Sequence, residues 1–85
     1  MPYVYILKCR DGSYYTGYTT DLYRRVEEHN QGTASKYTRG RLPVECVYFE
    51  FTHTVSEALK RENSIKKLSR SQKDRLVQSF NGKPS

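Results

Sequence analysis

Three runs of aromatic and β-branched residues along the chain have the pattern of β-strands. Residues 3–9 (YVYILKC) and 13–19 (SYYTGYT) are the first two, and residues 10–12 between them are typical of a hairpin turn. A third apolar run, at 44–51 (VECVYFEF), follows Pro43 and predicts a well-buried strand. The first two strands are therefore expected to pair as an antiparallel hairpin.

The length of the hairpin turn decides which side chains share a face of the sheet. A two-residue turn pairs Tyr5 with Tyr18 and puts Tyr15 on the opposite face. A three-residue loop, with Gly12 in the left-handed conformation, pairs Tyr5 with Gly17 and keeps Tyr15 on the same face. We favour the three-residue loop because glycine adopts the left-handed conformation without a steric cost.

Helical signals mark the rest of the chain. Residues 21–30 (DLYRRVEEHN) predict a helix that either Thr20 or Asp21 caps. The sequence TVSE at 54–57 is a capping box and predicts the start of a second helix, which continues to about residue 68. Residues 70–80 predict a shorter, basic last helix.

The remaining segments have no clear period. Residues 31–42 (QGTASKYTRGRL) contain glycine, serine, threonine and several cations, which predicts a loop. A chain of 85 residues forms a single domain, which we expect to span residues 1–80, with a frayed tail at 81–85. The order of elements, ββαβα with a further short helix, predicts an α+β fold.

Charge narrows the classes of partner. The chain has 15 Lys and Arg residues against 9 Asp and Glu, a formal charge of +6, which attracts polyanions. Nucleic acid is the commonest such partner and an anionic membrane surface is next, although charge alone is equally compatible with simple solubility. No apolar stretch approaches the roughly 20 residues that cross a bilayer, so no membrane association is expected.

The two cysteines do not indicate a metal site. Cys9 and Cys46 lie in predicted strands, and the chain has no CxxC motif or Cys/His cluster of the kind that binds zinc. Without a signal peptide, the pair is typical of reduced, buried thiols in a cytosolic protein. The expected location is therefore cytoplasmic.

Polar residues occur on the inner faces of both main helices. In the first helix, Leu22 and Val26 mark the apolar stripe, and Arg25 and His29 fall beside it, one turn apart. We expect both polar side chains to point towards the sheet.

In the second helix, Val55, Ala58, Leu59 and Ile65 define the predicted apolar face. Glu62 falls near the middle of that face. Burying a carboxylate lowers the stability of a fold by several kcal/mol unless the group is paired or bound to a metal.

If these faces converge, Tyr5, Tyr15, Arg25, His29 and Glu62 form one polar pocket. A carboxylate suits Mg²⁺ or Mn²⁺, a guanidinium suits phosphate oxygens, and a tyrosine can orient or deprotonate water if nearby cations lower its pKa. Each residue alone has a plainer interpretation, because strand tyrosines are usually packing residues, a helical Arg–His pair is often solvated, and Glu62 can simply pair with Arg25. Only the joint pattern points to phosphodiester cleavage.

The same residues carry a family resemblance. YVY at 3–5 and YTG at 15–17 resemble the paired signature of the GIY-YIG nuclease superfamily. The continuation YTGYTTDLYRRVEEHN, the stretch KYTRGRLPVECVYFE and the later EALKRENSIKKL are similar to its small stand-alone bacterial branch, called URI-type. The resemblance covers roughly residues 2–80. The first triplet departs from the signature because its glycine is missing, and only Tyr5 is retained.

The resemblance implies a fold and roles for the polar residues. The fold is a three-stranded antiparallel sheet flanked by helices in the order ββαβα(α). One divalent ion, Mg²⁺ or Mn²⁺, is expected on Glu62, and Arg25 is expected to bind the scissile phosphate. Tyr5 is expected to act as the general base with help from His29, while Tyr15 positions water or phosphate.

Further positions follow from the same resemblance. Gly17 leaves space opposite Tyr5, Gly12 shapes the turn, and Asn81 falls near a family asparagine late in the domain. Seven basic residues are expected to contact phosphates without regard to base sequence: Lys36, Arg39, Arg41, Lys66, Lys67, Arg70 and Lys73.

The implied function is a metal-dependent DNA endonuclease that uses an activated water and leaves 5′-phosphate and 3′-hydroxyl ends. Because the chain lacks the added DNA-binding domain of many relatives, we expect weak or structure-based specificity, with branched or single-stranded DNA as substrate. A weak homodimer or a separate protein that supplies specificity is the expected partner. The rival hypotheses are a non-catalytic nucleic-acid-binding module and a toxin-like or RNA-directed nuclease.

Overall fold

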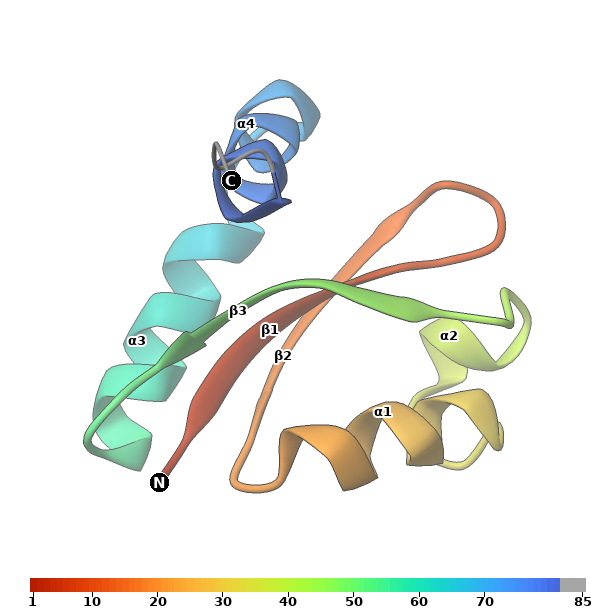
Figure 1. Ribbon diagram of the computed structural model, residues 1–85, viewed down its shortest axis with the longest axis horizontal. Coiled ribbons are helices and arrows are strands. Elements are labelled where there is room, and N and C mark those ends of the chain that lie inside the picture. The colour runs from red at the N-terminus through yellow and green to blue at the C-terminus, as the bar shows by residue number, and fades with distance from the viewer. Residues whose placement is uncertain (82–85) are drawn as a thin grey trace.

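The computed structural model describes residues 1–81, with the side chain of Asn81 excepted, and it has the predicted α+β architecture (Figure 1). The elements, in chain order, are β1 (Tyr3–Lys8), β2 (Tyr14–Thr19), α1 (Leu22–Asn30), α2 (Lys36–Arg39), β3 (Glu45–Phe51), α3 (Val55–Lys66) and α4 (Arg70–Asn81). The strands form one antiparallel sheet in the order β2-β1-β3, so β1 lies in the centre. Residues 82–85 of the expected tail lie outside the described residues.

The hairpin between β1 and β2 has the three-residue loop that the sequence favours. The backbone N–H of Cys9 donates to the carbonyl of Ser13 at 2.8 Å, and Gly12 has a φ of 86°, in the left-handed region. The register therefore pairs Tyr5 with Gly17, and Tyr15 lies on the same face of the sheet as Tyr5.

Helices cover both faces of the sheet, and each face has its own core. On one face, Val4 and Ile6 of β1 pack with Ala58 and Ile65 of α3, and α4 adds its apolar side chains to this core. On the other face lie the buried residues Tyr5, Leu7, Cys9 and Val44, against which Leu22 and Val26 of α1 pack. Figure 1 shows α3 and α4 on one side of the sheet, and α1 and α2 on the other.

The helix starts follow the predicted capping signals. Of the two candidates for α1, Asp21 is the cap, and its carboxylate accepts the backbone N–H of Arg24 at 3.1 Å. In α3 the capping box is complete, because Thr54 and Glu57 each accept a backbone N–H from the other's position. These caps fix where the helices that carry Arg25, His29 and Glu62 begin.

The prediction of an unbroken loop over residues 31–42 is wrong. Residues Lys36–Arg39 form the one-turn helix α2, whose start is capped by the Ser35 hydroxyl, which accepts the backbone N–H of Tyr37. Thr38, in this turn, is fully buried. A four-residue helix is too short to show a period in sequence, so the pattern gave no sign of it.

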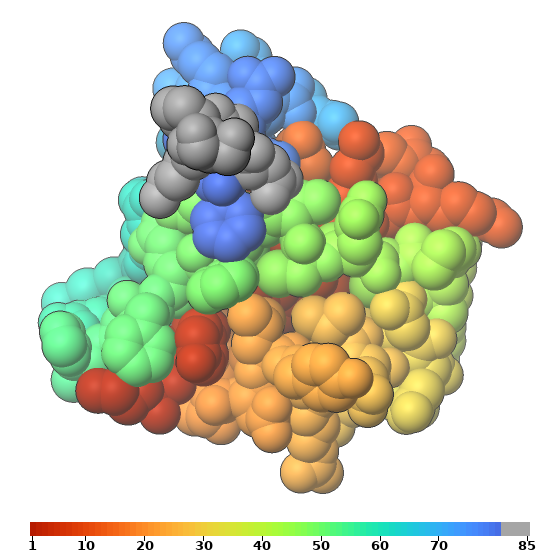
Figure 2. All heavy atoms as spheres, in the orientation of Figure 1, coloured from red at the N-terminus to blue at the C-terminus, as the bar shows by residue number. Residues whose placement is uncertain are grey.

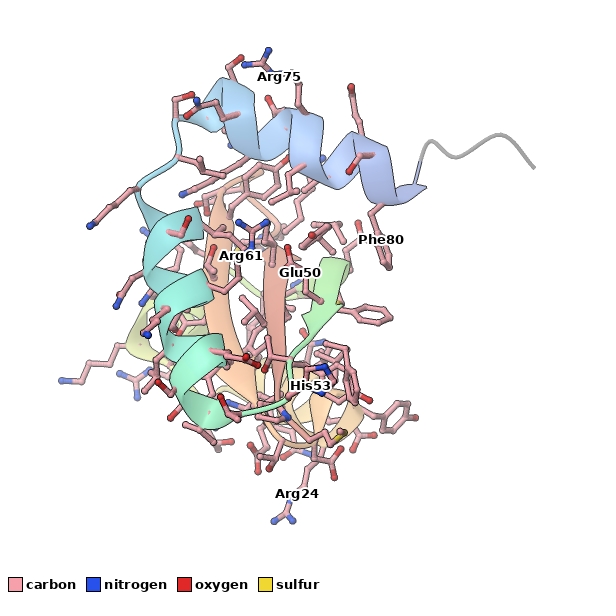
Figure 3. All side chains as sticks on the ribbon, turned by 90° about the vertical axis from the view of Figure 1, so that its left-hand side faces the viewer. Arg24, Glu50, His53, Arg61, Arg75 and Phe80 are labelled. Carbon is pink, nitrogen blue, oxygen red and sulfur yellow. The ribbon has the colours of Figure 1, made fainter. Side chains whose placement is uncertain are left out.

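The predicted apolar face of α3 is also partly wrong. Ala58 and Ile65 are fully buried, but Val55 and Leu59 are 45% and 41% exposed. Arg61 of the same helix faces the sheet, and its guanidinium makes a bidentate contact with Glu50 of β3 at 2.7–2.9 Å. Figure 3 shows Arg61 and Glu50 pointing towards one another between α3 and the sheet. Glu62 lies one turn from both Ala58 and Ile65, and its side chain is 13% exposed.

Both cysteines are free, as expected, but only Cys9 is buried, while Cys46 is half-buried. None of the helices described here is long and apolar enough to cross a bilayer.

Candidate active site

A chain of hydrogen-bonded side chains runs from β1 through α1 to α2. The Tyr5 hydroxyl lies 2.9 Å from Nε2 of His29, and Nδ1 of His29 lies 2.9 Å from Oγ1 of Thr38. Tyr5 is 1% exposed, and His29 and Thr38 are 0% exposed. Three polar side chains are thus buried together and hydrogen-bond to one another. A small core tolerates buried polar groups only when they have such partners.

Gly17 makes room for the Tyr5 ring. A Cβ at position 17 would lie 2.7 Å from the Tyr5 hydroxyl oxygen and 2.9 Å from Cζ of the same ring, both far inside van der Waals contact. It would also lie 3.2 Å from the Tyr15 ring. The signature glycine on β2 is therefore required by the close approach of the Tyr5 side chain.

Burial shifts the pKa values of both groups that share the first hydrogen bond. It raises the pKa of Tyr5 to about 12, against the opposing effect of the Arg25 guanidinium beside the hydroxyl. It lowers the pKa of His29 to about 4, and the positive charge of Arg25 acts in the same direction. Both groups are therefore neutral at pH 7.

Arg25 has unused hydrogen-bonding capacity. Its Nη1 donates to Glu28 at 3.2 Å, and its Nε is buried with no hydrogen-bond partner among the residues that the structure describes. About a third of the side chain is exposed. A guanidinium that is half-buried, permanently charged and partly unpaired is suited to an anionic ligand such as phosphate.

Tyr15 extends the cluster towards the surface. Its ring makes an edge contact with His29 at a centroid distance of 5.1 Å and stacks on Tyr37 at 6.0 Å. The guanidinium of Arg41 lies over the ring of Tyr37, at 4.1 Å from the ring centroid. The packed order is therefore His29, Tyr15, Tyr37 and Arg41, from the buried core to the solvent.

Glu62 approaches the cluster from the other side of the sheet. Its side chain is 13% exposed and pairs with Lys66 at 3.4 Å, one turn along α3. Its charge contributes to the raised pKa of Tyr5, which places the two groups within electrostatic reach. The structure thus brings Tyr5, Tyr15, Arg25 and His29 together, whereas within residues 1–81 no hydrogen bond or ion pair joins Glu62 to these four.

The seven predicted phosphate contacts fall into two groups. Lys36, Arg39 and Arg41 lie on or next to α2, and the other four lie at the end of α3 and in α4, on the opposite side of the sheet (Figure 1). Three of the seven already have acidic partners: Arg41 pairs with Asp11, Lys66 with Glu62 and Arg70 with Asp74.

Sequence reasoning missed two members of the cluster, Thr38 and Tyr37. Both lie in the segment predicted to be a loop. The available signal was Ser35 three residues before Thr38, which is the spacing of a cap followed by a helical turn. The side chain of Asn81 lies outside the described residues.

A hollow of about 710 Å³ lies elsewhere, between α1 and β3, and Figure 2 shows it between the orange helix and the green strand. It is lined by apolar and aromatic side chains, among them Val26, Phe49 and Phe80. None of the five predicted catalytic residues lines it, so it is separate from the Tyr5 cluster.

The fold and the cluster together define a class of small α+β domains with a tyrosine-centred polar site on one sheet face. The family comparison agrees with that class, because the GIY-YIG catalytic domain matches residues 1–75. The chain belongs to the GIY-YIG family.

Relatives cover nearly the whole chain. It is 57% identical over 76 residues to a UPF0213 protein of Halobacterium salinarum, covering 89% of this chain and 99% of that one. It is also 57% identical over 79 residues to a UPF0213 protein of Clostridium perfringens, covering 93% and 85%.

Solved structures show the same fold. The solution NMR structure of the UPF0213 protein BH0048 from Bacillus halodurans has a TM-score of 0.63 and 48% identity, over 96% of this chain and 88% of that one. The solution NMR structure of the protein EF2693 from E. faecalis has a TM-score of 0.61 and 46% identity, over 98% and 88%.

Proposed function

We propose that this protein is a divalent-metal-dependent DNA endonuclease that hydrolyses phosphodiester bonds with an activated water. Membership of the GIY-YIG family supports nuclease activity in general, since the match to its catalytic domain spans residues 1–75. The observation that carries the proposal for this chain is the buried hydrogen bond between Tyr5 and His29, beside the unpaired Nε of Arg25.

In this proposal the protein's own side chains bind, orient and move protons. Arg25 holds the scissile phosphate through its free donors, and Tyr15 limits where the water or phosphate can sit. Tyr5 removes a proton from the attacking water, with His29 as its hydrogen-bond partner. A phenol with a pKa near 12 is a weak acid and rarely loses its proton at pH 7. Tyr5 therefore needs a partner that accepts the phenolic proton while the Tyr5 oxygen takes a proton from water.

Glu62 is the proposed ligand of one Mg²⁺ or Mn²⁺ ion. In the described part of the chain, no group of three or more His, Cys, Asp or Glu side chains is placed to hold an ion. A single carboxylate that is mostly buried, with Lys66 as its ion-pair partner, fits an ion that takes most of its shell from water and substrate phosphate. When bound, such an ion neutralises negative charge on the phosphate and the leaving oxygen.

The proposed substrate is DNA, branched or single-stranded, and the proposed products carry 5′-phosphate and 3′-hydroxyl ends. The positive charge of the chain supports a polyanionic substrate, and the small size of the domain supports recognition by DNA structure more than by base sequence. A cytoplasmic location, and a second copy or another protein that adds specificity, belong to the same proposal.

Replacing Glu62 tests the assignment. We expect Glu62→Gln to lower nicking of supercoiled plasmid by roughly 10²-fold or more, because the proposed ion loses its only protein ligand while the side-chain volume is kept. The measurement is the initial nicking rate in Mg²⁺, in Mn²⁺ and in chelator, with a single-stranded, a branched and an RNA substrate in parallel.

Glu27→Gln is the matched control, since Glu27 is an exposed carboxylate on α1 that lines the separate hollow and is not among the groups that shift the pKa of Tyr5. It should cut at the rate of the parent. If Glu62→Gln nicks as fast as Glu27→Gln, Glu62 does not hold the ion. Tight binding of DNA by the parent with no nicking in either metal would support the non-catalytic module, and faster cleavage of RNA than of any DNA would support an RNA-directed nuclease.

A further inference from the structure

We propose that Thr38 is a positioning residue that fixes His29 in the tautomer with its proton on Nδ1, so that the Tyr5 hydroxyl donates its proton to Nε2. The assignment of the tautomer stands on hydrogen-bond geometry alone. Its consequence for catalysis rests on the proposed function.

The first argument comes from the Thr38 end of the chain. The Thr38 hydroxyl has one proton, and it donates this proton to the backbone carbonyl of Ser35 at 3.4 Å, an acceptor that has no proton of its own to give. Its oxygen is then free to accept, and the 2.9 Å contact with Nδ1 of His29 supplies the donor. Nδ1 must carry a hydrogen for both contacts to be hydrogen bonds.

The second argument comes from the Tyr5 end. The Tyr5 hydroxyl is almost fully buried, and its hydrogen needs an acceptor. The Arg25 guanidinium beside it can only donate, so within residues 1–81 Nε2 of His29 is the one partner that can accept the hydrogen of this hydroxyl. If Nε2 carried the proton instead, the phenolic hydrogen would have no acceptor among the described residues.

A neutral imidazole carries a hydrogen on only one of its two nitrogens. The first argument places that hydrogen on Nδ1, and the second independently excludes it from Nε2, so the two agree. His29 is neutral at pH 7, since burial lowers its pKa to about 4. A fully buried ring cannot exchange these partners for bulk water. Thr38, placed by the one-turn helix α2, therefore decides the direction of the hydrogen bond at Tyr5.

This direction provides a complete proton path for the proposed hydrolysis. As the water oxygen attacks phosphorus, its O–H bond breaks and the proton passes to the Tyr5 oxygen. The original Tyr5 proton passes to Nε2 of His29, which becomes an imidazolium with Nδ1–H still bonded to Thr38. The 3′ oxygen leaves with the electrons of the broken P–O bond and takes a proton from solvent. With the other tautomer, Nε2 could not accept a proton.

The decisive experiment is ¹⁵N NMR of the metal-free protein labelled at histidine, recorded at pH 7. We expect His29 to show a protonated Nδ1 and an unprotonated Nε2. His53 is the internal reference, because it is exposed; a His53→Gln variant assigns the two sets of signals. A protonated Nε2 on His29 in the parent protein would overturn the proposal without any variant.

Thr38→Val and Thr38→Ser test the role of the hydroxyl. Valine keeps the shape but cannot accept from Nδ1, so the Nδ1–H signal of His29 should shift or be replaced by an Nε2–H signal. Serine keeps the hydroxyl and should keep the parent tautomer. Backbone spectra check that both variants are folded. An unchanged Nδ1–H tautomer in folded Thr38→Val would show that Thr38 does not select it.

Kinetics test the consequence separately. Thr38→Val should lower kcat on the order of 10-fold to 10²-fold with little change in KM, and Thr38→Ser should restore it. In a Tyr5→Phe background the valine substitution should cost no more than about twofold, since the group that it acts through is gone. Failure of the kinetics with the NMR result intact would count against the proposed hydrolysis, and not against the tautomer.

Discussion

Burial acts on the two ends of the Tyr5–His29 hydrogen bond in opposite ways. It makes Tyr5 a weaker acid, with a pKa of about 12, and His29 a weaker base, with a pKa of about 4. Each change favours the neutral form, so the resting pair carries no charge inside the core. An arriving phosphate next to Arg25 adds negative charge close to this pair, which favours the imidazolium form of His29 at the moment when Tyr5 needs to pass on its proton.

The lowered pKa of His29 predicts a loss of stability in mild acid. The unfolded chain takes up a proton on this histidine as the pH falls through about 6.5, the ordinary pKa, whereas the folded protein resists until about 4. Between these values the unfolded state binds more protons, so the free energy of unfolding decreases as the pH decreases. We expect a decrease of up to about 3 kcal/mol from this group, measured by urea unfolding at pH 7, 5.5 and 4.5.

His29→Gln is the comparison for this prediction, because glutamine keeps an amide donor and acceptor and does not titrate. The variant should lose less stability than the parent over the same interval. Three carboxyls have a lowered pKa and stabilise the fold until a still lower pH: Asp11, Glu50 and Asp74. All three are present in both proteins, so their effect on stability cancels in the comparison. Parallel curves for the parent and His29→Gln would mean that His29 is not the group that titrates.

At the scale of single residues, the sequence predicted the site residues that lie at regular strand or helix positions, and it missed Thr38, which does not. Tyr5, Tyr15, Arg25 and His29 follow from strand and helix periods together with the family motifs, and the structure brings them together. Thr38 is fully buried because α2 folds back over α1 and His29, a tertiary contact nine residues away from its partner. No period of the chain encodes such a contact.

At the scale of elements, the β1–β2 hairpin was predictable and the rotation of α3 was not. Gly12 in the left-handed conformation fixes a three-residue loop, and the register follows from local chemistry alone. The orientation of α3 depends instead on Arg61 meeting Glu50 on another strand. Leu59 is exposed on this helix, and the charge of Glu62 acts on Tyr5.

The pairing of β2 with β1 predicts a large effect of one methyl group. Gly17→Ala puts a Cβ 2.7 Å from the Tyr5 oxygen, and the Tyr5 ring cannot move away because it is buried and bonded to His29. We expect a loss of about 1–3 kcal/mol in the free energy of unfolding, as for overpacked cores. Urea unfolding of the purified variant measures it, and nicking activity should fall with the displaced hydroxyl.

Gly40→Ala is the matched control for this substitution. Gly40 ends α2 with a φ of −90°, and a Cβ there meets nothing within 4 Å. Its stability should therefore be equal to or slightly above that of the parent. The packing argument for Gly17 is wrong if both alanine variants unfold at the same urea concentration.

At the scale of the whole molecule, the positive charge is divided between the two sides of the sheet. Lys36 and Arg39 are exposed on α2, on the side that carries Tyr5 and Arg25, whereas Lys67 and Lys73 lie with α3 and α4 on the other side. A rigid DNA helix that reaches Arg25 approaches from the α2 side. The charges on that side are therefore the better candidates for phosphate contacts.

This division predicts how salt changes DNA affinity. Each phosphate contact contributes about 0.9 to the slope of log affinity against log salt for duplex DNA. The double variant Lys36→Gln with Arg39→Gln should therefore reduce the slope by about 2, if both residues contact phosphates. Fluorescence anisotropy with the non-cutting Glu62→Gln protein, without divalent ions, measures affinity apart from cleavage.

Lys60→Gln with Lys67→Gln is the control of equal charge, because both lysines are exposed on α3 or at its end, on the far side of the sheet. If net charge alone attracts DNA, the two double variants reduce the slope equally, because each lowers the formal charge of +6 by the same amount. If DNA binds over Arg25, the α2 pair reduces it more. A larger reduction from the α3 pair would move the binding face to the α3–α4 side of the sheet.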